Sequence, residues 1–432
     1  MSHVDDHPLR YALSNELHAR PFSAVDAPCM AAFVALKPPA DAAGRDKSCD
    51  RTHLEQLLDR HGAPLPAREA THHATAIGRH HLKWESHTEF VTYTAVEPGL
   101  SERPFDPRLF EVFPPDWLAT APGARVSSIL FRVDFIPPEL DRIRTLLTDW
   151  FEMESVAVSE VLDGAAIIAS DFRIDRSGHT RMAVFVRPET GPRRIGRILQ
   201  RLCEIETYKS MSMLGLARAR ALSPRMGELD QRLNQLTEAM TGPGTSAEDT
   251  LGALLEISAE LERMLVQSSF RFGATGAYEA IVHQRIEVMR EERFDGRQTF
   301  NEFMMRRYDP AMRTVKSAQA RLASMADRAM RAGTLLSTRV DVERSAQNQK
   351  LLESMDQRAD MQLRLQRTVE GLSVVAISYY GVNLAANMAM PLAEPLGLGR
   401  ALVMFALTPL VVGTVWLVMR RIRTRLERAP RG

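Results

Sequence analysis

Two apolar stretches near the C-terminus decide the fold: GLSVVAISYYGVNLAANMAM at residues 371–390 and ALVMFALTPLVVGTVWLVM at residues 401–419. Neither stretch contains a charged residue. Each has roughly the 20 residues that a helix needs to cross the hydrocarbon core of a bilayer. The sequence therefore predicts transmembrane helices over residues 368–390 and 401–419, joined by a short periplasmic loop at 391–400.

Basic residues flank this pair of stretches asymmetrically. The connecting loop carries only Arg400, whereas Arg364 and Arg367 precede the first stretch and a cluster follows the second: Arg420, Arg421, Arg423 and Arg425. The positive-inside rule then places both termini in the cytoplasm, with 420–432 as a basic cytoplasmic tail. The first 22 residues are polar and lack the apolar core of a signal peptide, so roughly 360 residues are expected in the cytoplasm.

Charge and cysteine content exclude several classes of protein. The chain has 55 basic and 54 acidic residues, a net charge of +1, and this balance lacks the broad basic field that nucleic-acid binding requires. Nucleic acid is therefore not an expected partner. Cys29, Cys49 and Cys203 are too few and too scattered for a disulfide framework or a zinc site, so we expect three reduced thiols.

The first 215 residues are predicted to form a cytoplasmic α/β domain. β-Rich runs are separated by turns and by helical patterns, and their polar-apolar alternation is typical of a sheet covered on one face. A mixed sheet flanked by helices, within an α+β fold overall, is the expected architecture. The predicted strands lie at 28–36, 76–96, 126–135, 165–174 and 181–186.

Beyond residue 193 the strand patterns end, and helices are predicted at 193–221, 226–240 and 246–267. A helical subdomain is expected at 216–308. Ser246 and Asp249 have the spacing of a capping box at the start of the third helix.

One very long helix should follow, with a stalk at 309–367 that continues into the first span. Asp309-Pro310 is a typical helix start, and no further proline occurs before Pro391. A coiled-coil-like apolar seam runs along Val315, Ala318, Leu322, Met325, Ala329, Ala332 and Leu336. The seam is interrupted at Val340, Glu343, Gln347 and Lys350 before Leu352, Met355 and Ala359 resume it. This zone is either a solvated helix face or a hydrated vestibule inside an oligomer.

The first span carries one polar stripe. Five positions fall within about an 80° arc at 100° per residue: Ser373, Ala376, Tyr380, Asn383 and Asn387. The stripe could face a pore, or it could serve helix packing and interhelical hydrogen bonds. For Ser378, which lies outside the stripe, packing is our interpretation.

The order of these parts resembles the CorA-type magnesium channels, which carry a Gly-Met-Asn motif after tyrosine at the outer end of the first span. Tyr380-Gly381-Val382-Asn383 occupies that place. The resemblance implies a pentamer whose first spans line a path for Mg²⁺ or another divalent cation, transported or regulatory. The implied pore or selectivity residues are Tyr380, Gly381, Val382, Asn383 and Asn387, and the possible gate residues near the inner end are Val369, Leu372 and Val375.

This chain departs from the CorA pattern in three ways. Val382 replaces the methionine, the Met-Pro pair that usually follows appears only at Met390-Pro391, and Glu394 alone makes the outer loop acidic. Magnesium specificity and transport itself therefore stay open. The alternative is a membrane-anchored scaffold or sensor without transport activity.

A second resemblance extends over nearly the whole chain and carries no mechanism. The sequence is similar to an uncharacterised family of bacterial membrane-anchored proteins. The motifs that carry the similarity are His7-Pro8-Leu9-Arg10, His18-Ala19-Arg20-Pro21-Phe22, His87-Thr88-Glu89-Phe90 and Thr368-Val369-Glu370-Gly371-Leu372-Ser373.

Histidines concentrate before residue 88 and raise the question of a metal or an active site. In an extended run His81, Lys83, Glu85, His87 and Glu89 project from one face, so His81 and His87 are weak candidates for metal ligands. Solvated polar residues are the simpler interpretation, and no metal site is assigned.

Near the N-terminus, Glu16, His18 and Arg20 could suggest acid-base chemistry, but an i,i+4 ion pair explains Glu16 and Arg20. The sequence contains no phosphate loop, nucleophile elbow or dinucleotide fingerprint in a suitable context. We therefore expect no enzyme activity and no cofactor.

Overall fold

The structure is a computed structural model that describes residues 6–11, 13–14, 22–39, 44–68, 70–240, 246–393 and 399–427. The chain divides into two compact units, Met1–Thr334 and Leu335–Gly432. The first unit contains a mixed sheet with helices, and the second contains the two candidate membrane helices. The α+β fold class and the N-terminal mixed α/β region are confirmed.

A sheet of nine strands forms the centre of the first unit in the described part of the chain, in the order β2-β3-β4-β1-β5-β8-β7-β6-β9. β5 and β8 pair in parallel, and the other neighbours pair antiparallel. The strands are β1 (Cys29–Lys37), β2 (His72–Ile77), β3 (His80–Ser86), β4 (Val91–Pro98), β5 (Ala124–Phe135), β6 (Ala157–Val161), β7 (Ala166–Ser170), β8 (Thr180–Val186) and β9 (Glu292–Arg293).

Both faces of this sheet are covered, so the expectation of a sheet covered on one face is wrong. Every residue of β1 is buried. Its Ala31 and Phe33 belong to one hydrophobic cluster with the long helices, while Ala32 and Val34 belong to a second cluster with the shorter ones. A central strand buried on both sides has no polar face to alternate with, which is why β1 is apolar almost throughout.

Short helices cover the second face. They are α2 (Ser48–Arg60), the 3₁₀ helix η1 (Pro107–Val112), α3 (Pro115–Ala119) and α4 (Leu140–Trp150). Trp84, Tyr93 and Trp117 are almost fully buried among them. The sheet and its aromatic core therefore fix this half of the unit.

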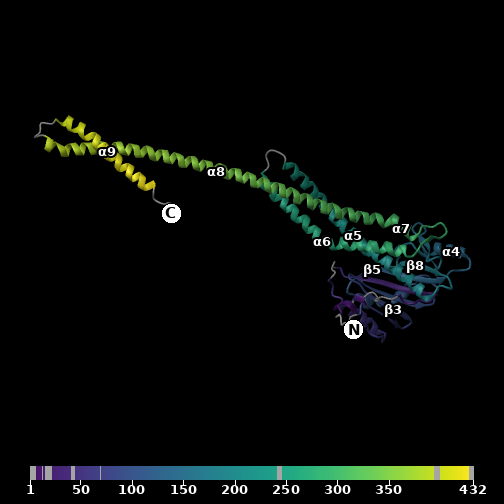
Figure 1. Cartoon of the computed structure of the whole chain (residues 1–432). Helices are drawn as coiled ribbons and strands as arrows, with labels where there is room; N and C mark the ends of the chain where they lie inside the picture. Colours follow the sequence, from purple (N-terminus) through teal and green to yellow (C-terminus); the bar gives the residue numbers. More distant parts are fainter. Residues whose placement is uncertain are drawn as a thin grey trace, which may run out of the picture. The chain divides into compact units, whose positions relative to one another are not determined.

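The long helices α5 (Pro192–Ala239) and α6 (Ala247–Glu287) pack side by side over the other face (Figure 1). The predicted break between 193–221 and 226–240 is wrong, because α5 continues through Pro224. A proline removes one helix hydrogen bond, and burial of Leu222, Met226 and Leu229 on either side offsets this loss. The Ser246 hydroxyl accepts from the Asp249 amide, which is one of the two hydrogen bonds of the predicted capping box.

Two strands, β6 and β9, were not predicted from the sequence. β6 is short, and β9 is a two-residue strand that follows α6 and pairs with β6. The expectation that strands end before residue 193 is therefore wrong, because Glu292–Arg293, far beyond that position in the sequence, returns to the sheet edge and pairs with β6.

The helix α7 (Phe300–Arg307) is followed by α8 (Asp309–Ala393), which starts where Asp309-Pro310 predicts and is continuous past residue 367. The residues of the predicted apolar seam lie on the buried side of α8. Val315, Leu322, Met325, Ala329 and Leu336 are buried, and Ala318 and Ala332 pack partly buried against the core. Beyond Val340 the residues of the interrupted zone and of the resumed seam are exposed.

The second unit consists of α8 from residue 335 onward and α9 (Arg400–Glu427). The helical run Phe300–Pro391 and the run Arg400–Ile422 each contain a window long and apolar enough to cross a membrane. Within this unit α8 and α9 pack together (Figure 1), and a Cβ on Gly381 would lie 3.0 Å from a Val411 methyl. The predicted loop 391–400 falls partly outside the described residues, and so does Glu394.

Candidate functional site

A cavity of about 50 Å³ lies between the sheet and α5. This volume holds roughly three to five water molecules or a ligand of similar size. Strands β3 and β4 supply one wall, and α5 supplies the other. The polar lining residues include His81, Lys83, Glu85, Thr92 and Thr94 from the strands and Gln200, Glu204, Thr207 and Tyr208 from the helix.

The alternating face predicted from the sequence is real. His81, Lys83, Glu85 and His87 all line this cavity, because side chains two apart along a strand point to the same side. Glu89, the last member of the series, lies beyond the end of β3 and instead pairs with a helix residue.

A chain of charge-assisted contacts crosses the cavity wall. Lys83 Nζ lies 3.1 Å from Glu85 Oε1 and donates to Gln200 Oε1 at 2.8 Å. Gln200 Nε2 donates in turn to Glu204 Oε1 at 3.0 Å, and Glu204 accepts from Arg285. Buried ion pairs contribute little net stability but are sensitive to the loss of one partner. This network therefore joins β3, α5 and α6 in one specific arrangement.

One hydroxyl in the lining lacks a hydrogen-bond partner in the part of the chain that the structure describes. Thr207 is 2% exposed, and its Oγ1 makes no hydrogen bond within the described residues. A buried hydroxyl is normally satisfied by protein or by ordered water, so the cavity suits a small polar occupant. The neighbouring Cys203 is a poor nucleophile, because burial raises the pKa of its thiol well above the usual value.

The His87-Thr88-Glu89-Phe90 motif forms the turn between β3 and β4. Arg45 donates to the carbonyl oxygens of His87 and Phe90 at 2.9 and 3.0 Å, and it pairs with the buried Asp50. Burial raises the pKa of Asp50 although Arg45 opposes the shift. The motif residues are thus held by Arg45, which precedes α2, and by Arg271 and Tyr278 of α6.

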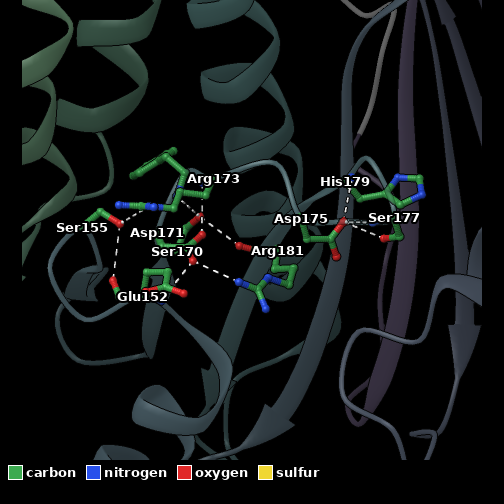
Figure 2. Close-up of polar contacts among 10 residues, drawn as sticks. Glu152, Ser155, Ser170, Asp171, Arg173, Asp175, Ser177, His179 and Arg181 are labelled. Atoms are coloured by element: carbon green, nitrogen blue, oxygen red, sulfur yellow. Dashed lines mark hydrogen bonds and ion pairs between the residues drawn. The ribbon is translucent and has the colours of Figure 1, made fainter.

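A second polar cluster, shown in Figure 2, looks at first like a catalytic arrangement. Asp175 lies beside His179, and His179 Nδ1 lies 2.7 Å from Ser128 Oγ. However, Asp175 accepts from the backbone amide of His179 and not from its ring. Ser128 Oγ donates to the Phe33 carbonyl oxygen at 3.0 Å, so Nδ1 of His179 must be the donor to Ser128.

The His179 ring is therefore the wrong tautomer to act as a base toward Ser128. Burial and the charge of Arg125 lower the pKa of His179 to about 4. Asp171, in the same figure, accepts from Arg181 and from the amides of Glu152 and Arg173. These contacts order the connection between β7 and β8.

The described residues contain no group of three or more histidine, cysteine or acidic side chains that could hold a metal ion. His81 is exposed at the cavity, and the His87 ring stacks on Phe90 at 4.4 Å. Glu16, His18 and Arg20 lie outside the described residues, as does the rest of the His18–Phe22 motif except Phe22.

In the second unit the predicted pore residues do not share one environment. Val382 is buried against the rest of its unit, and Gly381 faces α9. Tyr380 is 72% exposed, and Asn387 is exposed as well. The Asn383 side chain donates from Nδ2 to the Tyr379 carbonyl oxygen at 3.1 Å. Val369, Leu372 and Val375, the predicted gate residues, are exposed.

Sequence patterns missed the residues that complete these sites. Gln200, Glu204 and Arg285 lie on helices more than a hundred residues after β3. Periodicity could identify α5 and α6, but not which of their polar residues would meet the sheet. The run Arg193, Arg194, Arg197 and Arg201 was a visible signal of local charge at the start of α5.

The fold and these sites define a class: an α+β protein with two candidate membrane-spanning helices at its C-terminal end. The profile of the family described as "Protein of unknown function (DUF3422)" matches residues 5–426. The chain belongs to this family, which confirms the similarity to an uncharacterised family. Neither the curated proteins nor the solved structures contain a match to the chain.

Proposed function

We propose that this protein is a homo-oligomeric, CorA-like cation channel of the bacterial inner membrane, in which the first spans line the pore. The observation that carries the proposal is the orientation of the polar stripe on α8. The stripe lies on the side of the helix away from α9, where another copy of the chain could cover it.

The geometry behind this orientation is simple. Ser378, Val382 and Ala386 are the buried residues of this part of α8 and mark the side that packs against α9. At 100° per residue, the centre of the stripe around Tyr380 and Asn387 lies about 140° away from that side. Lipid offers no partners to an exposed polar stripe, so burial against other copies around an aqueous path is favourable.

Asn383 has the chemistry of a selectivity residue in this proposal. Its amide nitrogen donates to its own helix, which leaves Oδ1 as an acceptor. Mg²⁺ dehydrates reluctantly, and a ring of neutral amide oxygens can accept hydrogen bonds from its retained water shell. The apolar Val369, Leu372 and Val375 would form a gate that closes by dewetting. A pentamer, and both termini in the cytoplasm, complete the proposal.

Cation flux into liposomes tests the pore assignment. We expect Asn383→Ala to abolish Mg²⁺ or Co²⁺ uptake while the oligomer mass in mild detergent stays unchanged. Thr414→Ala is the matched control, because Thr414 on α9 also bonds its own helix, donating to the Leu410 carbonyl oxygen at 2.7 Å. Unchanged flux in the Asn383 variant would refute the selectivity ring, and a monomeric protein would refute the channel.

A second candidate function is a membrane-anchored sensor or scaffold without transport activity. The cavity with the unpartnered Thr207 hydroxyl favours it, because a small polar ligand there would contact both the sheet and α5. Wild-type flux equal to that of empty liposomes for Mg²⁺, Co²⁺ and K⁺, with an intact oligomer, would support this candidate over the channel.

A further inference from the structure

An open cleft of about 860 Å³ lies at the start of α5, apart from the cavity described above. Five arginines line it together with apolar and backbone groups from the neighbouring segments. The arginines are Arg193, Arg194, Arg197 and Arg201 of α5 and Arg290, which follows the end of α6.

The four arginines of α5 are placed where a helix least favours positive charge. They fall within about a 100° arc over the first turns of the helix. The positive end of the macrodipole lies there, and acidic residues are normally preferred. The first turn of α5 contains no acidic residue. An anion in the cleft would relieve both the repulsion between the arginines and the unfavourable dipole.

Nearby protein groups satisfy only part of this cluster. Asp163 pairs with Arg290 at 2.6 Å and lies 4.0 Å from Arg194. Arg194 and Arg201 each donate to a backbone carbonyl oxygen, of Leu162 at 2.6 Å and of Val288 at 3.0 Å. These contacts give Arg194, Arg201 and Arg290 a structural role.

Arg193 and Arg197 have no such explanation. Both side chains are exposed at the cleft. Within the described residues neither forms an ion pair, and the polar group of Arg197 lies over the Phe22 ring at 5.2 Å. Burial lowers the pKa of Arg201, and the positive charges of Arg197, Arg285 and Arg290 lower this pKa further.

We propose that this cleft binds a phosphate-bearing anion with two or more negative charges. Guanidinium groups bind phosphate oxygens through paired, charge-assisted hydrogen bonds, and the positive end of the α5 dipole adds a field of the same sign. The cleft is large enough for a nucleotide or for a phosphorylated headgroup. The proposal is independent of any transport through the membrane helices.

Calorimetric titration of the full chain in a zwitterionic detergent tests the site. The probes are inorganic pyrophosphate and ATP in one arm and mixed micelles containing cardiolipin, whose headgroup carries two phosphates, in the other. We expect at least one arm to show saturable binding that weakens as salt rises. Arg193→Ala/Arg197→Ala should weaken it by about tenfold or more, since two charge-assisted contacts are lost.

Arg220→Ala/Arg232→Ala is the matched control, because both residues are exposed on the same helix and removing them changes the net charge equally. This control should bind like the wild type. Binding in the first arm alone identifies a soluble phosphate compound, and binding in the second alone identifies a lipid headgroup. No binding in either arm, or equal weakening by the control, overturns the proposal. Without ligand, the melting temperature of the Arg193→Ala/Arg197→Ala variant should be no lower than that of the wild type. Weaker binding by this variant then cannot be attributed to loss of folding.

Discussion

Arg271 of α6 donates to the Glu89 carboxylate at 2.5 Å, although 182 residues separate them in the sequence. Both side chains are buried, at 2% and 3% exposure. Tyr278 donates to the second carboxylate oxygen at 2.7 Å, and burial together with Glu89 raises the pKa of its hydroxyl. The turn between β3 and β4 is thereby fixed to α6 by one ion pair and by one hydrogen bond from a neutral hydroxyl to the same carboxylate.

Removal of one member of this pair should destabilise the first unit strongly. A single Glu89→Leu or Arg271→Met change leaves a buried charge without its partner, at a cost of about 3–5 kcal/mol. The double variant should lose much less than the sum of the two single variants, because no unpaired charge remains. Urea unfolding of the full chain in detergent, followed by fluorescence of the buried Trp84, Trp117 and Trp150, measures these effects. Strict additivity would contradict the coupling.

Acid should weaken the first unit through His179. Its pKa is about 4 in the folded protein and 6.5 in the unfolded chain, so the unfolded state binds more protons between these values. The contribution of His179 is complete above pH 6.5 and is lost as the pH falls through 4. The full shift corresponds to on the order of 3 kcal/mol.

His179→Asn keeps a donor for Ser128 and removes the titration. We expect the stability of this variant to depend less on pH between 4 and 6.5 than that of the wild type. His61→Asn, at an exposed position after α2, is the control and should retain the wild-type profile. An unchanged slope in the His179 variant would exclude this residue as the acid-sensitive group.

Two glycines of α5 should respond to alanine in opposite directions. A Cβ at Gly196 would lie 1.7 Å from the Ser23 carbonyl oxygen, so Gly196→Ala should force α5 away and destabilise by about 1–3 kcal/mol. A Cβ at Gly227 would meet no atom within 4 Å. Gly227→Ala should therefore stabilise by about 0.5–1 kcal/mol through its helix propensity. Thermal unfolding of the two variants, compared with the wild type, measures both effects. A loss of stability in both variants would mean that α5 does not tolerate alanine at either glycine, and would contradict the role of close packing at Gly196 alone.

The orientation in the membrane can be tested with a native thiol. Cys49 is exposed, whereas Cys29 and Cys203 are buried. If the first unit is cytoplasmic, a membrane-impermeant maleimide should label Cys49 in inverted inner-membrane vesicles and not in intact spheroplasts. Cys49→Ser should abolish the labelling. Equal labelling in spheroplasts would place this unit outside the cytoplasm and reverse the topology.

The sequence by itself determined the elements whose signals are local. The length of the two uncharged stretches predicted the candidate spans, and the spacing of Val315 to Leu336 predicted both a helix and its buried side. These features depend on the helical period and on the transfer of apolar side chains out of water. Both can be read from residues that are close together in the sequence. The face shared by His81, Lys83 and Glu85 followed in the same way from the period of a strand.

Only the tertiary structure decided which distant groups meet. Pro224 would end an isolated helix, yet α5 continues because packing on both sides offsets the lost hydrogen bond. Glu89 finds Arg271, and Arg290 joins the arginines of α5, because the sheet and α6 bring together segments that no local pattern relates. Burial, charge pairing and the excess positive charge of the cleft are properties of that packing, so they could not be predicted from the chain alone.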